Sequence, residues 1–278
     1  MSILHCGAFR LSLDRPLIMG IVNLTPDSFS GDGVGDDVAA AIAHAEAQRA
    51  AGADILDLGA ESSRPGAAPV PAETEIARLL PVLRALRDWG VPVSVDTTKP
   101  EVMRMAIDEG AALINDIAAL QAPGALAAVA ASDAGICLMH MQGEPRTMQA
   151  QPHYADVVAE VRDFLAMRVA ACTRAGIARE RLLVDPGFGF GKTVEHNYTL
   201  LRELRRFAEL GVPLLAGLSR KSLLGAVTGR PNGDARLPAS VAAAVLAVER
   251  GARIVRVHDV AATKDALAVL AATEGRTQ

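Results

Sequence analysis

PVSVDTTKPEVMRMAIDEGAALIND, residues 92–116, contains one complete repeat of the pattern from which the fold class can be predicted. An apolar run ends in Asp96, a helical pattern runs from Pro100 to Gly110, and a second apolar run ends in Asp116. Proline is favoured in the first turn of a helix and glycine just after the last one. The apolar runs do not alternate with polar residues, which is typical of strands buried on both faces of a parallel sheet. The stretch therefore predicts a strand–helix–strand unit.

The same unit recurs along the whole chain. Alanine-rich helical patterns separate eight apolar runs, which are Leu17–Asn23, Asp54–Leu58, Pro92–Asp96, Ala112–Asp116, Ile136–His140, Leu182–Asp185, Pro213–Leu218 and Arg253–His258. Eight repeats without a linker favour an α/β fold of the closed (β/α)₈ type, the TIM barrel, over a doubly wound open sheet. We expect residues 1–278 to form a single domain, and the first dozen residues to form a short hairpin that closes the bottom of the barrel.

Composition excludes several classes of protein. The formal net charge is -4, whereas a nucleic-acid binder carries a strongly basic surface. The three cysteines, Cys6, Cys137 and Cys172, are too far apart for a metal-ligand motif or a disulfide framework, which favours a reducing compartment. The longest run of small apolar residues, 239–248, is shorter than the ~18 residues of a membrane span. The N-terminus lacks a secretory signal. We expect a cytoplasmic protein that binds neither nucleic acid nor membrane.

Polar residues gather where the predicted strands end. Every strand ends in such residues or runs into them: Asn23, Glu61–Arg64, Asp96, Asn115–Asp116, His140, Asp185, Ser219–Ser222 and Arg256–Asp259. One polar residue at a strand end is commonly a helix cap or a partner of loop amides. Eight strand ends together predict a binding site at the carboxyl ends of the strands, where the active sites of barrel enzymes lie.

Two loops at this end of the barrel are unusually long. Residues 25–35 and 62–71 are rich in Gly, Pro and Ser, which is typical of functional loops or of variable surface. Three phenylalanines fall in predicted loops, where each either encloses a flat ring or pins its own loop: Phe29, Phe188 and Phe190. The run GFGFGKT (187–193) does not match a phosphate-binding loop, because Pro186 stands where the first glycine is required. We interpret it as a tight turn in which backbones approach closely.

The polar side chains indicate the class of ligand. Asp96, Asn115 and Asp185 can accept hydrogen bonds from the ring N–H and amino groups of a heterocycle. Lys221 can donate to a ring carbonyl or nitrogen beside them.

A second group of side chains suits an anion. Arg64, Arg256 and His258 supply positive charge, and the loops after strands 7 and 8 are the usual phosphate site of such barrels. Asn23 offers an oxygen ligand for Mg²⁺, which binds largely through substrate phosphates and keeps several waters. The residues therefore predict a polar bicyclic substrate with a phosphorylated leaving group.

Nearly the whole chain resembles the dihydropteroate synthases, in order and at matching spacing. The segments that carry the resemblance are GIVNLTPDSFSGDG (20–33), DLGAESSRPGA (57–67), SVDTTKPEV (94–102), INDI (114–117), LMHMQGEPRTMQ (138–149), LLVDPGFGFGKTVEHNY (182–198), LSRKSLLG (218–225) and RVHDV (256–260). The resemblance implies condensation of 6-hydroxymethyl-7,8-dihydropterin diphosphate with p-aminobenzoate, which releases pyrophosphate and forms 7,8-dihydropteroate for folate synthesis.

The resemblance also implies a role for particular residues. The pterin would be held by Asp96, Asn115, Asp185 and Lys221. The diphosphate would be held by Ser63, Arg256 and His258, with Mg²⁺ on Asn23. The p-aminobenzoate, with which sulfonamides would compete, would contact Phe29, Arg64, Pro65, Phe190, Lys221 and Ser222. Lys221, Arg256 and His258 would be the catalytic residues, and a homodimer is expected, with the apolar helix at 239–249 as its interface or packed on the barrel.

No nucleophilic side chain is required by this chemistry. We expect a dissociative reaction, in which pyrophosphate leaves before the aryl amine attacks, because no base stands out near the amine. Two alternatives stay open. One is a pterin-binding methyltransferase barrel, which would not need the predicted anion site. The other is a catalytically silent relative that still binds pterin.

Overall fold

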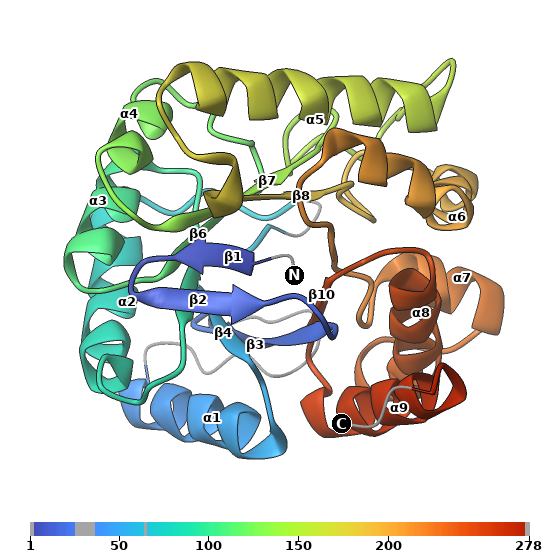
Figure 1. Ribbon diagram of the computed structural model, residues 1–278, viewed down its shortest axis with the longest axis horizontal. Coiled ribbons are helices and arrows are strands. Elements are labelled where there is room, and N and C mark those ends of the chain that lie inside the picture. The colour runs from blue at the N-terminus through green and yellow to red at the C-terminus, as the bar shows by residue number, and fades with distance from the viewer. Residues whose placement is uncertain (1–2, 26–36, 64–65, 276–278) are drawn as a thin grey trace.

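The predicted TIM barrel is confirmed by a computed structural model, which describes residues 3–25, 37–63 and 66–275 (Figure 1). Eight parallel strands pair in the order β8-β7-β6-β5-β4-β3-β10-β9. Their bounds are β3 Leu17–Asn23, β4 Ile55–Gly59, β5 Val93–Asp96, β6 Leu113–Asp116, β7 Gly135–Met139, β8 Leu182–Asp185, β9 Leu215–Ala216 and β10 Ile254–Val257. A parallel bridge between Val184 and Leu214 joins β8 to the residue before β9, so the sheet closes on itself.

Helices surround the strands (Figure 1). They are α1 Val38–Ala51, α2 Ala72–Leu86, α3 Pro100–Asp108, α4 Ala125–Ala130, α5 Val157–Arg174, α6 Val194–Arg202, α7 Ser222–Thr228, α8 Leu237–Glu249 and α9 Val260–Thr273, with short 3₁₀ turns η1 Arg179–Arg181, η2 Leu204–Leu210 and η3 Gly233–Arg236. Capping residues mark the ends of two helices, and those of the second were predicted from the sequence. The Asp37 carboxylate accepts from the Ala40 amide at the start of α1, and Gly52 ends that helix with a φ of 101°. Pro100 begins α3, and Gly110 follows it with a φ of 96°.

The predicted N-terminal hairpin is also present. Strands β1 (Ile3–Cys6) and β2 (Phe9–Ser12) pair antiparallel across the end of the barrel opposite to the carboxyl ends of the strands (Figure 1). Leu4, Cys6 and Leu13 are buried there against the first residues of the barrel strands, among them Leu17 and Leu113. The hairpin therefore seals the bottom, and access to the barrel interior is left to the opposite end.

One strand is shorter than the sequence predicts. The apolar run Pro213–Leu218 has ladder pairing only at Leu215 and Ala216. Its first residues make single backbone hydrogen bonds, for example from the Val184 amide to the Pro213 carbonyl at 3.0 Å. Gly217 follows, and a Cβ atom there would lie 3.8 Å from Asp185 Oδ2 and 3.9 Å from Lys221 Nζ. Across the described part of the chain, no helix is long and apolar enough to cross a membrane.

Candidate active site

The carboxyl ends of four strands bring a guanidinium group against two carboxylates. Arg256 of β10 donates from Nε to Asp57 Oδ2 at 2.6 Å and from Nη2 to Asp96 Oδ2 at 3.2 Å. The Nδ2 of Asn115 lies 3.5 Å from the same oxygen of Asp57. Asp185 ends β8 nearby in the barrel, and its Oδ1 accepts from the Gly187 amide at 2.7 Å. The predicted pterin residues Asp96, Asn115 and Asp185 thus line one end of the barrel.

Sequence reasoning missed Asp57, which lies at the centre of this cluster. Asp57 is fully buried, and its Oδ1 has no hydrogen-bond partner among the described residues. Ser94, its register partner on β5, is also buried, and its hydroxyl is likewise without a partner there. A charged residue in the middle of the apolar run ILDLG was the signal that could have revealed Asp57, because buried strands rarely carry one. The barrel interior therefore contains two polar atoms, Asp57 Oδ1 and the Ser94 hydroxyl oxygen, that are available to accept hydrogen bonds from a ligand.

Burial shifts the protonation of the carboxylates. It raises the pKa of Asp96 to about 7, because the charged form is poorly solvated; Arg256 opposes this shift and Asp57 reinforces it. Burial also raises the pKa of Asp185, with Lys221 acting in the opposite direction. For Arg256 burial alone would lower the pKa, but Asp57 and Asp96 outweigh it and the pKa rises. The guanidinium is therefore a fixed cation, and Asp96 beside it can exchange a proton near neutral pH.

Lys221 lies beside Asp185 at the edge of this cluster. Burial lowers the pKa of Lys221 to about 8, although Asp185 partly compensates. Its Nζ donates to the carbonyl of Phe188 and lies 4.7 Å from the centre of the Phe190 ring. The two phenylalanines differ in role: Phe188 is fully buried in the core, so it pins its own loop, whereas Phe190 is half-buried beside the cation. Only Phe190 of this pair is placed to contact a ligand ring.

The glycine run after β8 is a close-approach turn, as predicted. Gly187 and Gly191 have φ values of 71° and 61°, and a Cβ atom on them would lie 1.9 Å from the His140 carbonyl oxygen and 2.3 Å from that of Gln142. Lys192 stabilises the turn, because its buried Nζ donates to the carbonyls of Gly187 and Phe190, both at 2.9 Å. That Nζ also lies 3.0 Å from His140 Nδ1. Lys192 therefore acts as part of the scaffold of the loop that carries Phe190.

His140, at the end of β7, is paired with this lysine and is a neutral side chain. Burial, together with the charge of Lys192, lowers the pKa of His140 to about 3. Burial also lowers the pKa of Lys192, to about 7. Since one group of the pair carries the proton, the imidazole accepts from the ammonium. His140, one of the polar residues at the predicted strand ends, thus has a structural partner.

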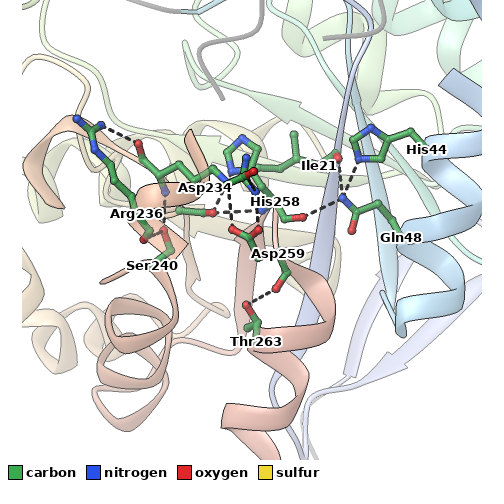
Figure 2. A network of polar contacts seen from close by, with 11 residues as sticks. Ile21, His44, Gln48, Asp234, Arg236, Ser240, His258, Asp259 and Thr263 are labelled. Atoms are coloured by element: carbon green, nitrogen blue, oxygen red, sulfur yellow. Dashed lines mark hydrogen bonds and ion pairs between the residues drawn. The ribbon is translucent and has the colours of Figure 1, made fainter. Parts of the chain in front are cut away.

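His258 belongs to a separate polar network around the end of β10 (Figure 2). The Ser219 hydroxyl lies 2.9 Å from His258 Nδ1, and the Gln48 amide of α1 donates to the carbonyl oxygens of His258 at 3.0 Å and Ile21 at 3.3 Å. The same hydroxyl accepts from the His258 amide at 3.2 Å, so its own proton is available for Nδ1. This arrangement favours the tautomer in which Nε2 of His258 carries the proton and can donate to an anion.

The loop between β9 and α7, which carries Ser219 and Lys221, is fixed by an ion pair. Arg220 has a φ of 58°, which is uncommon for a side chain other than glycine, and its guanidinium pairs with Asp259 through both carboxylate oxygens, at 3.0 and 2.5 Å. Its amide donates to the Ser240 hydroxyl of α8 at 2.9 Å. Arg236 donates to the Arg220 carbonyl at 3.0 Å. These contacts hold Ser219 and Lys221 at either side of Arg220.

Asn23 lies in the same row of the barrel as the predicted pterin residues. The register places Asn23 opposite Gly59, Gly59 opposite Asp96, and Asp96 opposite Asn115. Gly59 has no side chain, so the space between Asn23 Oδ1 and Asp96 stays open: a Cβ there would lie 4.0 and 3.8 Å from their atoms. Among the described residues, no three His, Cys, Asp or Glu side chains form a metal cluster. The Asn23 Oδ1 atom beside this open space is an oxygen donor of the kind that Mg²⁺ takes, so the residues here fit that ion.

A cavity of about 500 Å³ opens beside Asp96, between the residues that follow β4, β5, β6 and β7. It is lined by Ser62, Ser63, Asp96, Lys99, Ile117 and Arg146, among others. Ser63, predicted to bind a diphosphate, therefore shares a cavity with a predicted pterin residue. Ser222, predicted to contact p-aminobenzoate, directly follows Lys221 and begins α7. Three further residues predicted for that contact lie outside the described residues: Phe29, Arg64 and Pro65.

A barrel with buried acceptors, a central arginine and an adjacent lysine at its catalytic end defines this chain as a TIM-barrel enzyme. Residues 19–258 match the family described as pterin binding enzyme. The chain is 54% identical over 267 residues to the dihydropteroate synthase of Neisseria meningitidis serogroup C, covering 95% of this chain and 94% of that protein. The chain belongs to the dihydropteroate synthase family of transferases, and the predicted resemblance is confirmed.

Solved structures agree with this assignment. The Burkholderia cenocepacia dihydropteroate synthase complexed with 7,8-dihydropteroate superimposes with a TM-score of 0.91 at 53% identity, covering 99% of this chain and 97% of that one. The Xanthomonas albilineans enzyme with 4-aminobenzoic acid gives a TM-score of 0.92 at 53% identity, covering 99% of both chains. Both likenesses extend over the whole barrel.

Proposed function

We propose that this protein condenses 6-hydroxymethyl-7,8-dihydropterin diphosphate with p-aminobenzoate to give 7,8-dihydropteroate and pyrophosphate. The observation that carries the proposal is the acceptor cluster of Asp96, Asn115 and Asp185 beside Arg256 and Lys221. A pterin presents ring N–H and amino donors along one edge, which suits carboxylate and amide oxygens. It also presents a ring carbonyl, for which the Lys221 ammonium is the nearby donor. The two similar enzymes bound to dihydropteroate and to 4-aminobenzoic acid support the product and one of the substrates.

The diphosphate would lie between Ser63, Arg256 and His258. Arg256 is a permanent cation, and the Ser219 contact favours a proton on His258 Nε2. Donors fixed in advance on the leaving group's oxygens stabilise the charge that develops there without reorganisation of solvent. Asn23 would hold Mg²⁺, which when bound supplies further positive charge to the diphosphate oxygens. Arg256 would thus act as a catalytic residue by its charge, and His258 by a hydrogen bond from Nε2, with no proton transfer from either.

The p-aminobenzoate would stack on Phe190 beside Lys221 and Ser222. The half-buried Phe190 ring offers a flat apolar face, and the Lys221 ammonium lies 4.7 Å from its centre, ready to meet a carboxylate or a ring carbonyl. Phe29, Arg64 and Pro65 would complete the pocket from the two long loops. A sulfonamide, which carries an aniline like p-aminobenzoate, would compete for this position.

The reaction would proceed by dissociation. The bond between the exocyclic carbon and the bridging oxygen breaks first, and its electron pair leaves with pyrophosphate. The electron-rich dihydropterin delocalises the resulting cation until the lone pair of the aryl amine forms the new C–N bond. The amine then releases one proton to solvent. Holding the two substrates in register is worth up to ~7–11 kcal/mol of the barrier.

The test follows pyrophosphate release with the dihydropterin diphosphate, p-aminobenzoate and Mg²⁺, each withheld in turn. Turnover that needs both organic substrates, with dihydropteroate as product, supports the proposal. Pterin binding without turnover would favour a catalytically silent relative instead. A hydroxymethyl pterin formed when p-aminobenzoate is withheld supports dissociation, whereas strict dependence of pyrophosphate release on p-aminobenzoate contradicts it.

The whole chain is proposed to act as one domain in a cytoplasmic homodimer. All three cysteines are buried and unpaired, which suits a reducing compartment. Helix α8 packs on the barrel through Ser240, Ala243, Ala244 and Ala247, so the expected inward packing is present. Its opposite face is also apolar, with Pro238, Ala242 and Leu246 exposed one turn apart. That outward stripe is the proposed dimer surface, and sedimentation analysis tests it.

A further inference from the structure

A cluster of three charged side chains lies beside the candidate site, and none of the roles above uses it. Lys99 Nζ lies 2.8 Å from Glu61 Oε2 and 2.8 Å from Glu75 Oε2. The side chains of Lys99 and Glu61 are about one-fifth exposed, at 21% and 22%, and that of Glu75 is 0% exposed. Ion pairs this buried carry a large desolvation cost, so they are not explained as incidental surface contacts.

The cluster joins three elements that meet at the substrate end of the barrel. Glu61 follows β4 and directly precedes Ser62 and Ser63. Glu75 lies in the first turn of α2, and Lys99 stands between Asp96, which ends β5, and the first residue of α3. A single ammonium group therefore connects the strand that carries a pterin carboxylate to the loop that carries Ser63.

Glu61 holds both ends of that loop. Its Oε2 pairs with Lys99, while its Oε1 accepts from the Val70 amide at 2.7 Å. Residues 61 and 70 are thereby tied together across the loop between them. The start of the loop is also fixed from α2, because Arg78 donates to the Ala60 carbonyl at 3.1 Å.

Helix stability does not explain the choice of lysine at position 99. Lys99 occupies the N-cap position of α3 and makes no side-chain cap hydrogen bond. Ser, Thr, Asp or Asn would cap the helix better there, and a cation at a helix N-terminus opposes the helix dipole. Burial alone would lower the pKa of Lys99, but its bonds to Glu61 and Glu75 raise it, so it stays charged. The presence of lysine at position 99 is therefore explained by its ion pairs with Glu61 and Glu75.

Glu75 anchors the cluster from within. Its pKa is raised, because burial disfavours the carboxylate more than the bond to Lys99 favours it. Its Oε1 has no hydrogen-bond partner among the described residues. Lys99 is thus the main contact that compensates an otherwise costly buried acid, with a smaller contribution from Thr97.

We propose that Lys99, Glu61 and Glu75 form a positioning network, which fixes Ser63 against the diphosphate of the substrate. The proposal rests on the proposed function in one respect, the role of Ser63. Without Lys99, the loop would lose the ion pair between Lys99 and Glu61, which sets the distance of the loop from Asp96. Loss of the network should then weaken recognition of the diphosphate and leave recognition of the pterin ring unchanged.

The test compares two ligands, the dihydropterin diphosphate and the same dihydropterin without its diphosphate, by calorimetry. For Lys99→Met we expect roughly a 10- to 100-fold loss of affinity for the diphosphate form, since small misplacements cost this much. Affinity for the pterin alone should stay within about twofold. Lys99→Arg, which can still bridge both carboxylates, should recover most of the loss.

Arg84→Met is the matched control. Arg84 of α2 pairs with Glu109, the residue after α3, at 2.8 Å, so it joins the same two helices at the other end. This control should leave both affinities unchanged. Should Lys99→Met prevent folding, Glu61→Ala removes the tie to Val70 while keeping the pair between Lys99 and Glu75.

Equal losses for the two ligands in Lys99→Met, or no loss in either, would overturn the proposal. Hydrogen exchange at the Val70 amide is measured without substrate, so this readout stands apart from the proposed function. Glu61→Ala should accelerate that exchange, and an unchanged rate would also overturn the proposal. Wild-type protein that exchanges as expected but does not turn over would instead count against the proposed function alone.

Discussion

Arg256→Met removes the cation that lies between Asp57 and Asp96. Methionine keeps most of the side chain's length and apolar stem, so the change is mainly one of charge. In the wild type the guanidinium lies 2.6 Å from Asp57 and 3.2 Å from Asp96. After the exchange, Asp57 would stay fully buried with no counter-charge.

The expected cost follows from the exposure of the three groups. Removing one partner of a buried ion pair destabilises a protein by about 3–5 kcal/mol. Arg256 and Asp96 are 22% and 17% exposed, so water can partly screen the remaining charges. We therefore expect a loss near the lower end, about 3 kcal/mol in the free energy of unfolding at pH 8.

The assay is urea unfolding followed by circular dichroism, for Arg256→Met, Asp57→Asn and the double variant. In the double variant no uncompensated charge remains at position 57, so about 2 kcal/mol should be regained relative to Arg256→Met. Arg15→Met serves as the control. Arg15 pairs with Asp54 but is 60% exposed, and the loss there should stay below about 1 kcal/mol.

Turnover separates the two roles of Arg256. We expect both Arg256→Met and the double variant to lose roughly 10²- to 10³-fold in kcat, because neither offers a cation to the leaving group. Recovery of turnover together with stability would show that Arg256 serves only to neutralise Asp57. A stability loss no larger than that of Arg15→Met would refute the electrostatic interpretation of the cluster.

Three further predictions concern the side chains of Asp96 and the buried Lys192, and the close approach of backbones at Gly187. The folded pKa of Asp96 is raised to about 7 from an ordinary 3.8, so its contribution to stability is full below pH 3.8 and is lost as pH rises through 7. The difference in unfolding free energy between wild type and Asp96→Asn should fall by up to about 1.4 kcal/mol per pH unit between pH 5 and 6.5, and parallel pH curves from urea unfolding would contradict this. Lys192→Met leaves several buried acceptors without a donor and should cost about 3 kcal/mol; thermal unfolding unchanged from wild type would show that the turn does not need the ammonium. Gly187→Ala would place a Cβ 1.9 Å from the His140 carbonyl oxygen and should prevent soluble expression or lower the melting temperature by more than 10 °C, whereas Gly176→Ala, with a φ of 86° and open space around it, should cost only about 1 kcal/mol.

Local sequence patterns were enough to predict the barrel and the elements that carry most of the proposed site. Strands buried on both faces leave continuous apolar runs, and Pro100, Gly110 and Gly52 mark helix ends by local backbone preferences. Both signals depend on residues close together in the chain. The polar strand ends could be recognised for the same reason, because parallel strands in a barrel all end at the same face.

Which of those residues contact one another became clear only from the folded chain. Asp57 and Arg256 are 199 positions apart, and their 2.6 Å contact depends on how the barrel closes. Phe188 and Phe190 look alike in sequence, yet one fills the core and the other lies beside Lys221. In the sequence, Lys99 is not distinguished from any other residue before a helix. Its ion pair with Glu75 forms only because α2 packs beside α3. Charge pairing and burial are properties of groups brought together by folding, so local patterns could not reveal them.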